Sequence, residues 1–466
     1  MMNIVCKAMA ETLWRGVRFA AVAGVLMVMS GVPARTGEVP GAVALGGRLY
    51  DNWILELRYK PPQVRHPLYP AGGKLTGTPA ETWRCTTCHG WDYKGKDGAY
   101  GKTSDRYTGI AGLWALRGTD PAKIAAVLNA PAHGYDDIFY DDQINALAAF
   151  VSQGQVEMND SIDPATGQAR GDKTTQVEFY MTVCSNCHGA NGTETRDIPP
   201  VGFLARHSPY ETLHKLLVGH PGTKMPAIGV LGQARITDLL AFLQTLPERA
   251  DDTAPPVRDV LAAVVRGGRL YDNWILETHA TAPKGFHPAY PATQTTGVQA
   301  EMTWRCGGCH GWDYRGTEGQ ARAITPSVIA KSLRAGLPVE DVLTILGDSN
   351  HRYNGILNAR DQFDLATFIN KGLVDLDSFI DGAVAKGDPV RYKHYYEAIC
   401  APCHGFDGRK ITNAPPLGHM TRQNPWHAVH MVLNGHPDEL MPPMRVLEKQ
   451  IVIDLVAHLQ TLPADR

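Results

Sequence analysis

The sequence lacks a surplus of charge of either sign, and its N-terminal apolar run is short. Its 45 Lys and Arg residues nearly balance 47 Asp and Glu residues, which gives a formal charge of −2 at pH 7. Such a balance does not supply the basic surface on which nucleic-acid-binding proteins depend. The apolar run from Phe19 to Val32 has 14 residues, fewer than the ~18–20 that a membrane-spanning helix needs. These features argue against a nucleic-acid partner and against a spanning helix at the N-terminus.

Residues 1–34 have the pattern of an export signal. Three basic residues precede the apolar run, and the small-residue stretch Val32-Pro33-Ala34 follows it as a cleavage site. We expect cleavage after Ala34, with no membrane span left in the mature chain. Cleavage would remove three basic residues and one acidic residue, which leaves a formal charge of −4. The competing interpretation is an uncleaved anchor.

Cysteine is almost absent outside one motif. Of the nine cysteines, one is Cys6 in the predicted signal, and the other eight lie in four copies of Cys-x-x-Cys-His. This pentapeptide is the attachment signal of c-type haem, in which both thiols bond to the porphyrin and the histidine becomes the proximal iron ligand. A redox dithiol or half of a zinc site is the alternative for each pair, and a histidine after all four pairs favours haem. The predicted attachment and proximal residues are Cys85, Cys88 and His89; Cys184, Cys187 and His188; Cys306, Cys309 and His310; and Cys400, Cys403 and His404.

The chain is an internal duplication. The eleven residues from Gly46 to Glu56 recur unchanged from Gly267 to Glu277, and Thr82 to Cys85 recurs at the same offset. Within each half the second motif follows the first by about one small domain. The predicted order is therefore A-B-A′-B′, with a Pro- and Asp-containing linker at 247–256. The predicted domains are 36–162 (A), 170–248 (B), 257–380 (A′) and 384–466 (B′).

The B-type domains combine helical patterns with a methionine loop. Apolar residues at helical spacing run into the motif over 176–183 and 392–399, and again near each domain end over 236–243 and 451–459. Met225 and Met441 each precede a proline and lie 37 residues after their motif histidines. These segments resemble the class I cytochrome c fold, a mainly α fold of helices around covalent haem. The resemblance implies that Met225 and Met441 are distal iron ligands; Met444 is a second candidate in B′.

The resemblance covers essentially all of the chain after residue 34, as four tandem helical domains that carry four haem c groups. It also implies a periplasmic location, because bacteria attach this haem outside the cytoplasm. The histidines that precede each methionine, His214 with His220 and His430 with His436, are interpreted as helix and turn residues rather than ligands.

The A-type domains need another distal ligand, because no methionine lies between His89 and Met158 or between His310 and Met420. Aligning the halves places His133 against His351, each ahead of an apolar-periodic helix, and we expect bis-histidine ligation by these residues. The rival pair is His66 and His287, which lie in an insertion before the motif. An open iron is the third alternative.

Methionine raises the haem potential relative to histidine, so the pattern predicts higher potentials in B than in A. We expect an electron carrier of a respiratory chain rather than a catalyst, with redox proteins that present basic docking faces as its partners. The alternatives are an enzyme with an open A-domain haem, either a sulfur-compound oxidoreductase or a peroxidase-like enzyme, and an electron-transfer subunit of a larger periplasmic or membrane-associated dehydrogenase or reductase complex. Dihaem thiosulfate-oxidising cytochromes resemble the domain plan but use a cysteine ligand, and no cysteine of the mature chain is left for that role.

Overall fold

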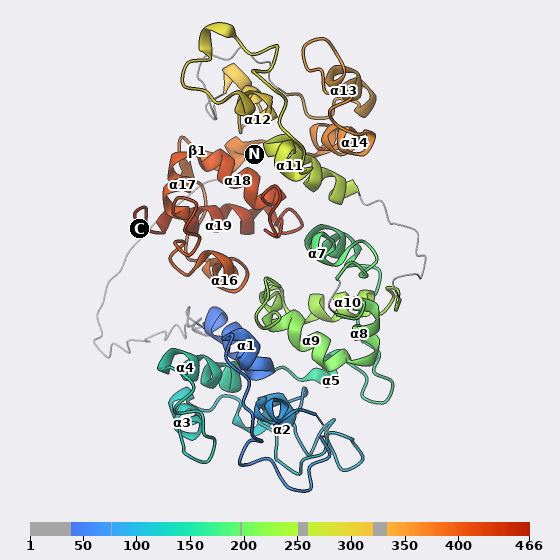
Figure 1. The fold of residues 1–466 in the computed structure, drawn as a ribbon, viewed down its shortest axis with the longest axis vertical. Coiled ribbons are helices and arrows are strands. Elements are labelled where there is room, and N and C mark those ends of the chain that lie inside the picture. Colours follow the sequence, from blue (N-terminus) through green and yellow to red (C-terminus); the bar gives the residue numbers. More distant parts are fainter. Residues whose placement is uncertain (1–38, 76, 196–197, 250–259, 320–332) are drawn as a thin grey trace, which may run out of the picture. The chain divides into compact units, whose positions relative to one another are not determined.

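The computed structural model describes residues 39–75, 77–195, 198–249, 260–319 and 333–466. The predicted signal at 1–34 and most of the predicted linker lie outside these residues. The described chain is mainly helical, as Figure 1 shows, which agrees with the expected fold class. No described helix is both long enough and apolar enough to cross a membrane.

In the first half, as expected, each motif has a helix before it and a helix after it in the chain. They are α1 (Val39–Glu56), α2 (Cys85–His89), α3 (Pro121–Leu128), α4 (Asp141–Ala149), α5 (Met158–Ser161), α6 (Val177–Phe179), α7 (Ser185–His188), α8 (Val201–His207), α9 (Pro209–Val218) and α10 (Gln233–Leu243).

The second half repeats this order and adds a small hairpin, β1 (Ile380–Asp381) with β2 (Val384–Ala385), in which Ile380 pairs with Ala385. Its helices are α11 (Val260–Glu277), α12 (Cys306–His310), α13 (Val339–Leu346), α14 (Ala359–Thr367), α15 (Lys393–Tyr395), α16 (Ala401–His404), α17 (Leu417–Gln423), α18 (Pro425–Asn434) and α19 (Lys449–Thr461).

Four helical patterns that the sequence suggested continue into single π-helical turns. These are η3 (Phe150–Gly154), η4 (Tyr180–Cys184), η9 (Phe368–Gly372) and η11 (Tyr396–Cys400). Two of them, η4 and η11, deliver the chain directly to a motif cysteine. A π turn adds one residue to the helical repeat, and it therefore changes the direction from which the following motif leaves the helix.

Glycine lets the first helix of each half pack closely against its neighbours. A Cβ atom on Gly46 would lie 1.9 Å from the carbonyl oxygen of Ala146 in α4, and one on Gly267 would lie 2.1 Å from that of Asp364 in α14. Only a residue without a side chain fits such an approach. The crossing brings α1 onto α4 and α11 onto α14, and it buries Tyr50 and Trp53 of α1 completely.

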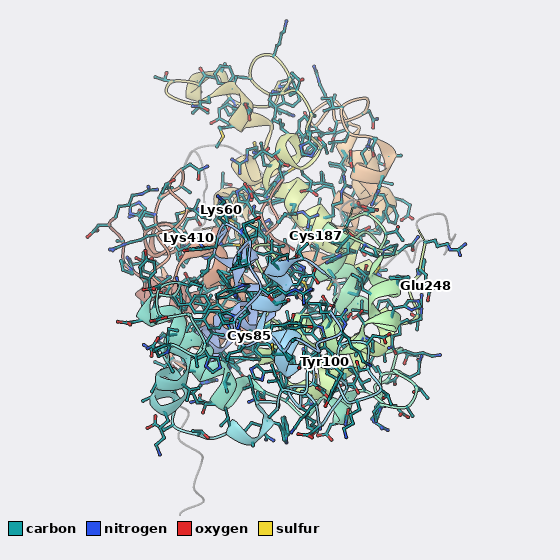
Figure 2. The ribbon with its side chains drawn as sticks, turned by 60° about the horizontal axis from the view of Figure 1, so that its bottom comes forward. Lys60, Cys85, Tyr100, Cys187, Glu248 and Lys410 are labelled. Atoms are coloured by element: carbon teal, nitrogen blue, oxygen red, sulfur yellow. The ribbon has the colours of Figure 1, made fainter. Side chains whose placement is uncertain are left out.

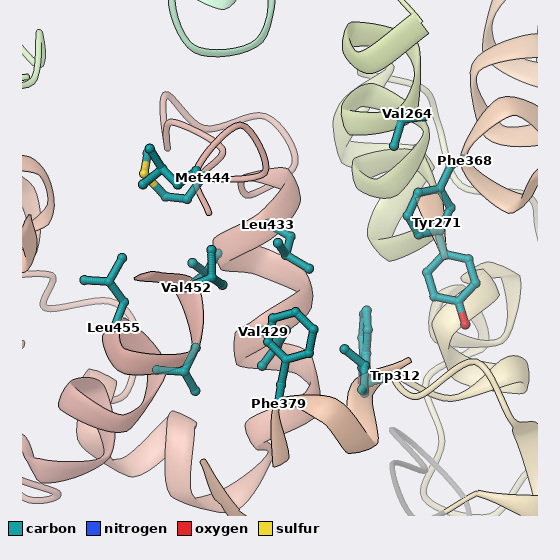
Figure 3. Packing of buried hydrophobic residues seen from close by; sticks show 14 of the residues in the cluster. Val264, Tyr271, Trp312, Phe368, Phe379, Val429, Leu433, Met444, Val452 and Leu455 are labelled. Carbon is teal, nitrogen blue, oxygen red and sulfur yellow. The ribbon is translucent and has the colours of Figure 1, made fainter. Parts of the chain in front are cut away.

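The buried apolar residues form two clusters, one built mainly from each half. In the second cluster Tyr271 lies 5.6 Å from Phe368 and 6.2 Å from Trp312, measured between ring centres (Figure 3). Each cluster combines A-type and B-type segments, and the described residues from 39 onward belong to one compact unit. The division into four domains therefore stays a prediction from the repeat.

Candidate haem sites

All four motifs lie on short helices that end in the same way. α2, α7, α12 and α16 each stop at a glycine with positive φ, between 73° and 79°, a conformation that other residues adopt at a cost. The carbonyl of this glycine accepts a hydrogen bond from a tyrosine hydroxyl in every case. The pairs are Tyr50 with Gly90 at 2.6 Å, Tyr180 with Gly189 at 2.8 Å, Tyr271 with Gly311 at 2.5 Å, and Tyr396 with Gly405 at 2.6 Å.

These tyrosines fix each motif to the helix that precedes it, and sequence reasoning did not find them. All four are at most 1% exposed. The signal was available, because Tyr50 and Tyr271 lie within the duplicated eleven residues, and Tyr180 and Tyr396 each stand four residues before a motif cysteine. The same anchoring at four places favours the same cofactor at four places.

The motif cysteines have free thiols in the described structure. Burial raises the pKa of Cys85, Cys184, Cys306 and Cys400 to about 12. Their second partners range from half-buried to exposed, as for Cys187 (Figure 2). Thiols with such raised pKa values are poor thiolate ligands and poor exchange nucleophiles. Within the described ranges no group of three or more His, Cys, Asp or Glu side chains has the arrangement of a metal-ion site.

The motif histidines have surroundings in which a neutral imidazole could bind a metal. The Nδ1–H of His89 donates to the carbonyl oxygen of Ala111 at 2.8 Å, which leaves the Nε2 lone pair for a metal. Burial lowers the pKa of His89, His188 and His404, which disfavours the protonated form of each ring. Such residues fit a covalently held haem at each motif.

In A′ the predicted distal histidine faces the proximal one. The rings of His310 and His351 are parallel within 8°, and their centres lie 6.3 Å apart. One iron bound to a nitrogen of each ring at roughly 2 Å would hold the ring centres about 6 Å apart. The residues therefore have the spacing that bis-histidine ligation requires.

In A the predicted distal histidine, His133, also lies near the motif. It is close enough for its charge to contribute to the lowered pKa of His89, after the larger effect of burial. The Nδ1 atom of His133 is buried and has no hydrogen-bond partner among the described residues. The described side chains of His89 and His133 do not form a parallel ring pair like that of His310 and His351.

The rival histidines are already engaged through both ring nitrogens. The Nε2–H of His66 donates to the backbone carbonyl of His133 at 2.8 Å, and its Nδ1 accepts the amide of Leu68 at 3.1 Å. His287 makes the same two bonds, to His351 at 3.0 Å and from Ala289 at 3.2 Å. Neither ring has a nitrogen left for iron in this arrangement.

The methionine loops of the B-type domains lie beside their motifs. Burial raises the pKa of Cys187, and the charge of Lys224, next to Met225, partly offsets this. Burial lowers the pKa of His188, and His220 at the start of the same loop lowers it further. Met225 is a partly buried member of the first core cluster, and Met441 is a partly buried member of the second. Met444, the second candidate in B′, is only 6% exposed and packs in the core.

His214 and His430 connect the A-type and B-type parts of each half. The hydroxyl of Tyr93 donates to Nδ1 of His214 at 2.9 Å, and Nε2–H of His214 donates to the carbonyl of Gly47 at 2.9 Å. His430 makes the same bonds with Tyr314 at 3.0 Å and Gly268 at 2.9 Å. Both histidines are fully buried and connect the segments predicted as A-type and B-type, which is a role that the sequence did not reveal.

No protein family model matches the chain. Among curated proteins, a cytochrome c-553-like protein of Synechocystis sp. (strain ATCC 27184 / PCC 6803 / Kazusa) is 30% identical over 92 residues, which are 19% of this chain and 84% of that protein. Among solved structures, the thiosulfate dehydrogenase TsdBA of Marichromatium purpuratum in its as-isolated form aligns over 81% of this chain and 86% of its own, with 19% identity and a TM-score of 0.20.

Proposed function

Since this chain belongs to the c-type cytochromes, we propose that it transfers electrons between redox partner proteins through four covalently attached haem c groups. The cysteines of the four motifs would hold the haems, and the motif histidines would bind the irons on the proximal side. The distal ligands would be His133 and His351 in A and A′, and Met225 and Met441 in B and B′.

The observation that carries this proposal is the facing pair His310 and His351. The two rings are parallel and their centres lie 6.3 Å apart, so an iron bound to a nitrogen of each ring would have both of these positions filled by the chain. A metal with all positions filled exchanges electrons but has no place for a substrate. The pair therefore supports a carrier over a catalyst.

Bound haem c supplies a one-electron redox couple, and the chain's side chains set the potential of that couple. A methionine thioether favours the reduced state relative to a histidine imidazole, so Met225 and Met441 would raise the potentials of the B-type sites. Imidazole ligands from His133 and His351 would keep the potentials of the A-type sites lower. Each half would then pair a low-potential site with a high-potential site.

The location and partners follow from the same proposal. The export pattern at residues 1–34 favours the periplasm. The slight negative charge of the rest of the chain, to which haem propionates would add, favours partners with basic docking faces. Service in a respiratory chain, as a free carrier or as a subunit of a larger redox complex, is part of this proposal.

The proposal is tested by counting haems and by electron paramagnetic resonance of the oxidised protein. We expect four haems per chain from the haem absorbance and the intact mass. We also expect four low-spin ferric signals, two of bis-histidine type and two of histidine–methionine type.

A strong high-spin ferric signal in fresh protein would contradict the carrier proposal. It would mean an open iron, and would favour a sulfur-compound oxidoreductase or a peroxidase-like enzyme at an A-type haem. Fewer than four haems would contradict the tetrahaem proposal itself.

A further inference from the structure

The insertion before each A-type motif carries one buried histidine. His66 is 6% exposed and His287 is 7% exposed, although most residues around them lie in exposed, irregular chain. A buried imidazole on such a segment must have its polar atoms satisfied. Both ring nitrogens of His66 and of His287 are hydrogen-bonded, and each Nε2–H donates to the backbone carbonyl of the predicted distal histidine.

The backbone of each of these histidines is fixed as well. The amide of His66 donates to Oγ1 of Thr82 at 2.9 Å, and Oγ1 of Thr82 in turn donates to the carbonyl of Pro79 at 2.6 Å. His287 and Thr303 repeat the arrangement at 2.9 Å and 2.6 Å. These threonines lie three residues before the first motif cysteine, so the insertion is attached directly to the motif.

An aromatic contact completes the attachment. The ring of His66 meets Trp83 edge to face at 4.5 Å, and His287 meets Trp304 in the same way at 4.5 Å. The carbonyl of Trp83 accepts a bond at 2.7 Å from the hydroxyl of Tyr135, two residues after His133. Tyr353 and Trp304 repeat that bond at 2.7 Å. The distal loop is therefore held at two points, by the insertion histidine and by the motif tryptophan.

We propose that His66 and His287 are positioning residues that hold the backbone of His133 and His351 so that the distal imidazoles reach the A-type irons. The inference rests on the proposed bis-histidine ligation. The inference assigns a role to the insertion. The proline after the methionine restricts the backbone of the B-type loops, whereas the loops of His133 and His351 would be held by the insertion histidine. The evidence for the inference is that both halves form the same hydrogen bonds, although the residues two positions after the histidines differ, Leu68 in A and Ala289 in A′.

The test uses four variants of the full haem-loaded protein: H66F, H66Q, H287F and H287Q. Phenylalanine keeps a ring against the tryptophan but removes both hydrogen bonds, whereas the glutamine amide can still donate to the carbonyl. We expect H66F and H287F each to lose one bis-histidine signal in electron paramagnetic resonance, and the glutamine variants to recover it in part. L68A, a change to an exposed side chain of the same insertion, is the matched control and should keep both signals.

Two further readouts keep the outcomes separate. Haem content and the histidine–methionine signals report whether each variant has folded. Amide hydrogen exchange of the two distal loops, residues 130–135 and 348–353, reports the anchoring without reference to ligation. We expect it to accelerate at 130–135 in H66F and at 348–353 in H287F, and in neither loop in L68A. Unchanged signals and unchanged exchange in both phenylalanine variants would overturn the inference. Wild-type protein without bis-histidine signals would instead overturn the ligation proposal, and the exchange comparison would still decide whether His66 anchors the loop.

Discussion

One hydrogen bond distinguishes the two predicted A-type distal ligands. Nδ1 of His351 lies 3.1 Å from Oδ1 of Asp348, whereas Nδ1 of His133 has no partner among the described residues. The residue that corresponds to Asp348 is Ala130, three positions before His133. A carboxylate that accepts the Nδ1–H of a ligand histidine makes the imidazole a stronger donor to the metal. The two A-type haems should therefore differ in potential, with the A′ haem lower.

The variant D348N tests this difference. Asparagine can still accept hydrogen bonds from the backbone amides of Asn350 and His351, which lie 2.8 Å from Asp348 Oδ1 in the wild type. It removes, however, the negative charge beside the His351 ring. We expect one of the two low-potential components in a spectroelectrochemical titration to shift to higher potential, while the other stays in place. A titration identical to that of the wild type would contradict the role of Asp348.

Buried histidines make stability depend on pH. Burial lowers the pKa of His430 from 6.5 to about 4, so the unfolded chain takes up a proton at a pH where the folded chain does not. Stability is then full above about pH 6.5 and falls as the pH decreases toward 4, by up to about 3 kcal/mol for this one group. We expect the denaturation midpoint of the wild type to fall more steeply over this range than that of H430Q. Equal slopes would show that the pKa of His430 is not lowered in the folded protein.

At the scale of elements, the sequence predicted the helices well and their contacts poorly. The patterns at 236–243 and 451–459 lie within α10 and α19, because an apolar helical face is a local property of the chain. The pattern at 392–399 was expected as one regular helix, and the structure has α15 followed by the turn η11. Helical periodicity alone does not distinguish a π turn from an α turn over so short a stretch.

The candidate site shows the same division between local and distant information. The motif residues follow from spacing alone, whereas the bond between His66 and His133 joins residues 67 apart, and that between Tyr93 and His214 joins residues 121 apart. A single sequence carries no record of such pairs. The assignment of His133, His351, Met225 and Met441 as ligands stays a prediction, now with supporting geometry in A′.

The crossing of α1 and α4 depends on one glycine. In G46A the new methyl group would overlap the carbonyl of Ala146, so the helices must move apart. We expect a loss of about 1–3 kcal/mol in the free energy of unfolding and a lower thermal midpoint. The matched control is G72A, since no atom lies within 4 Å of a Cβ at Gly72. Equal midpoints for G46A and the wild type would mean that the crossing contributes little.

For the whole molecule, the proposal predicts two groups of potentials. Replacing Met225 by histidine should move one high-potential component to lower potential, toward the A-type group, because imidazole favours the oxidised state relative to thioether. A redox titration followed at the haem absorption bands measures this, and Met441 in the other half provides the unchanged reference. If M225H left every component in place, Met225 would not be a ligand.

The buried bridge at His214 has a kinetic consequence. Tyr93, His214 and Gly47 join the two parts of the first half through buried hydrogen bonds, so packing and not collision would set the separation of the two haems proposed for this half. Electron movement within a half should therefore keep the same rate at any protein concentration and ionic strength. Exchange with an external protein, which depends on encounter between oppositely charged faces, should slow as salt is added. Flash photolysis with an attached photoreductant would measure the two rates separately. The rate of the internal step would be fixed by the fold, and the rate of the external step would depend on the surroundings of the protein.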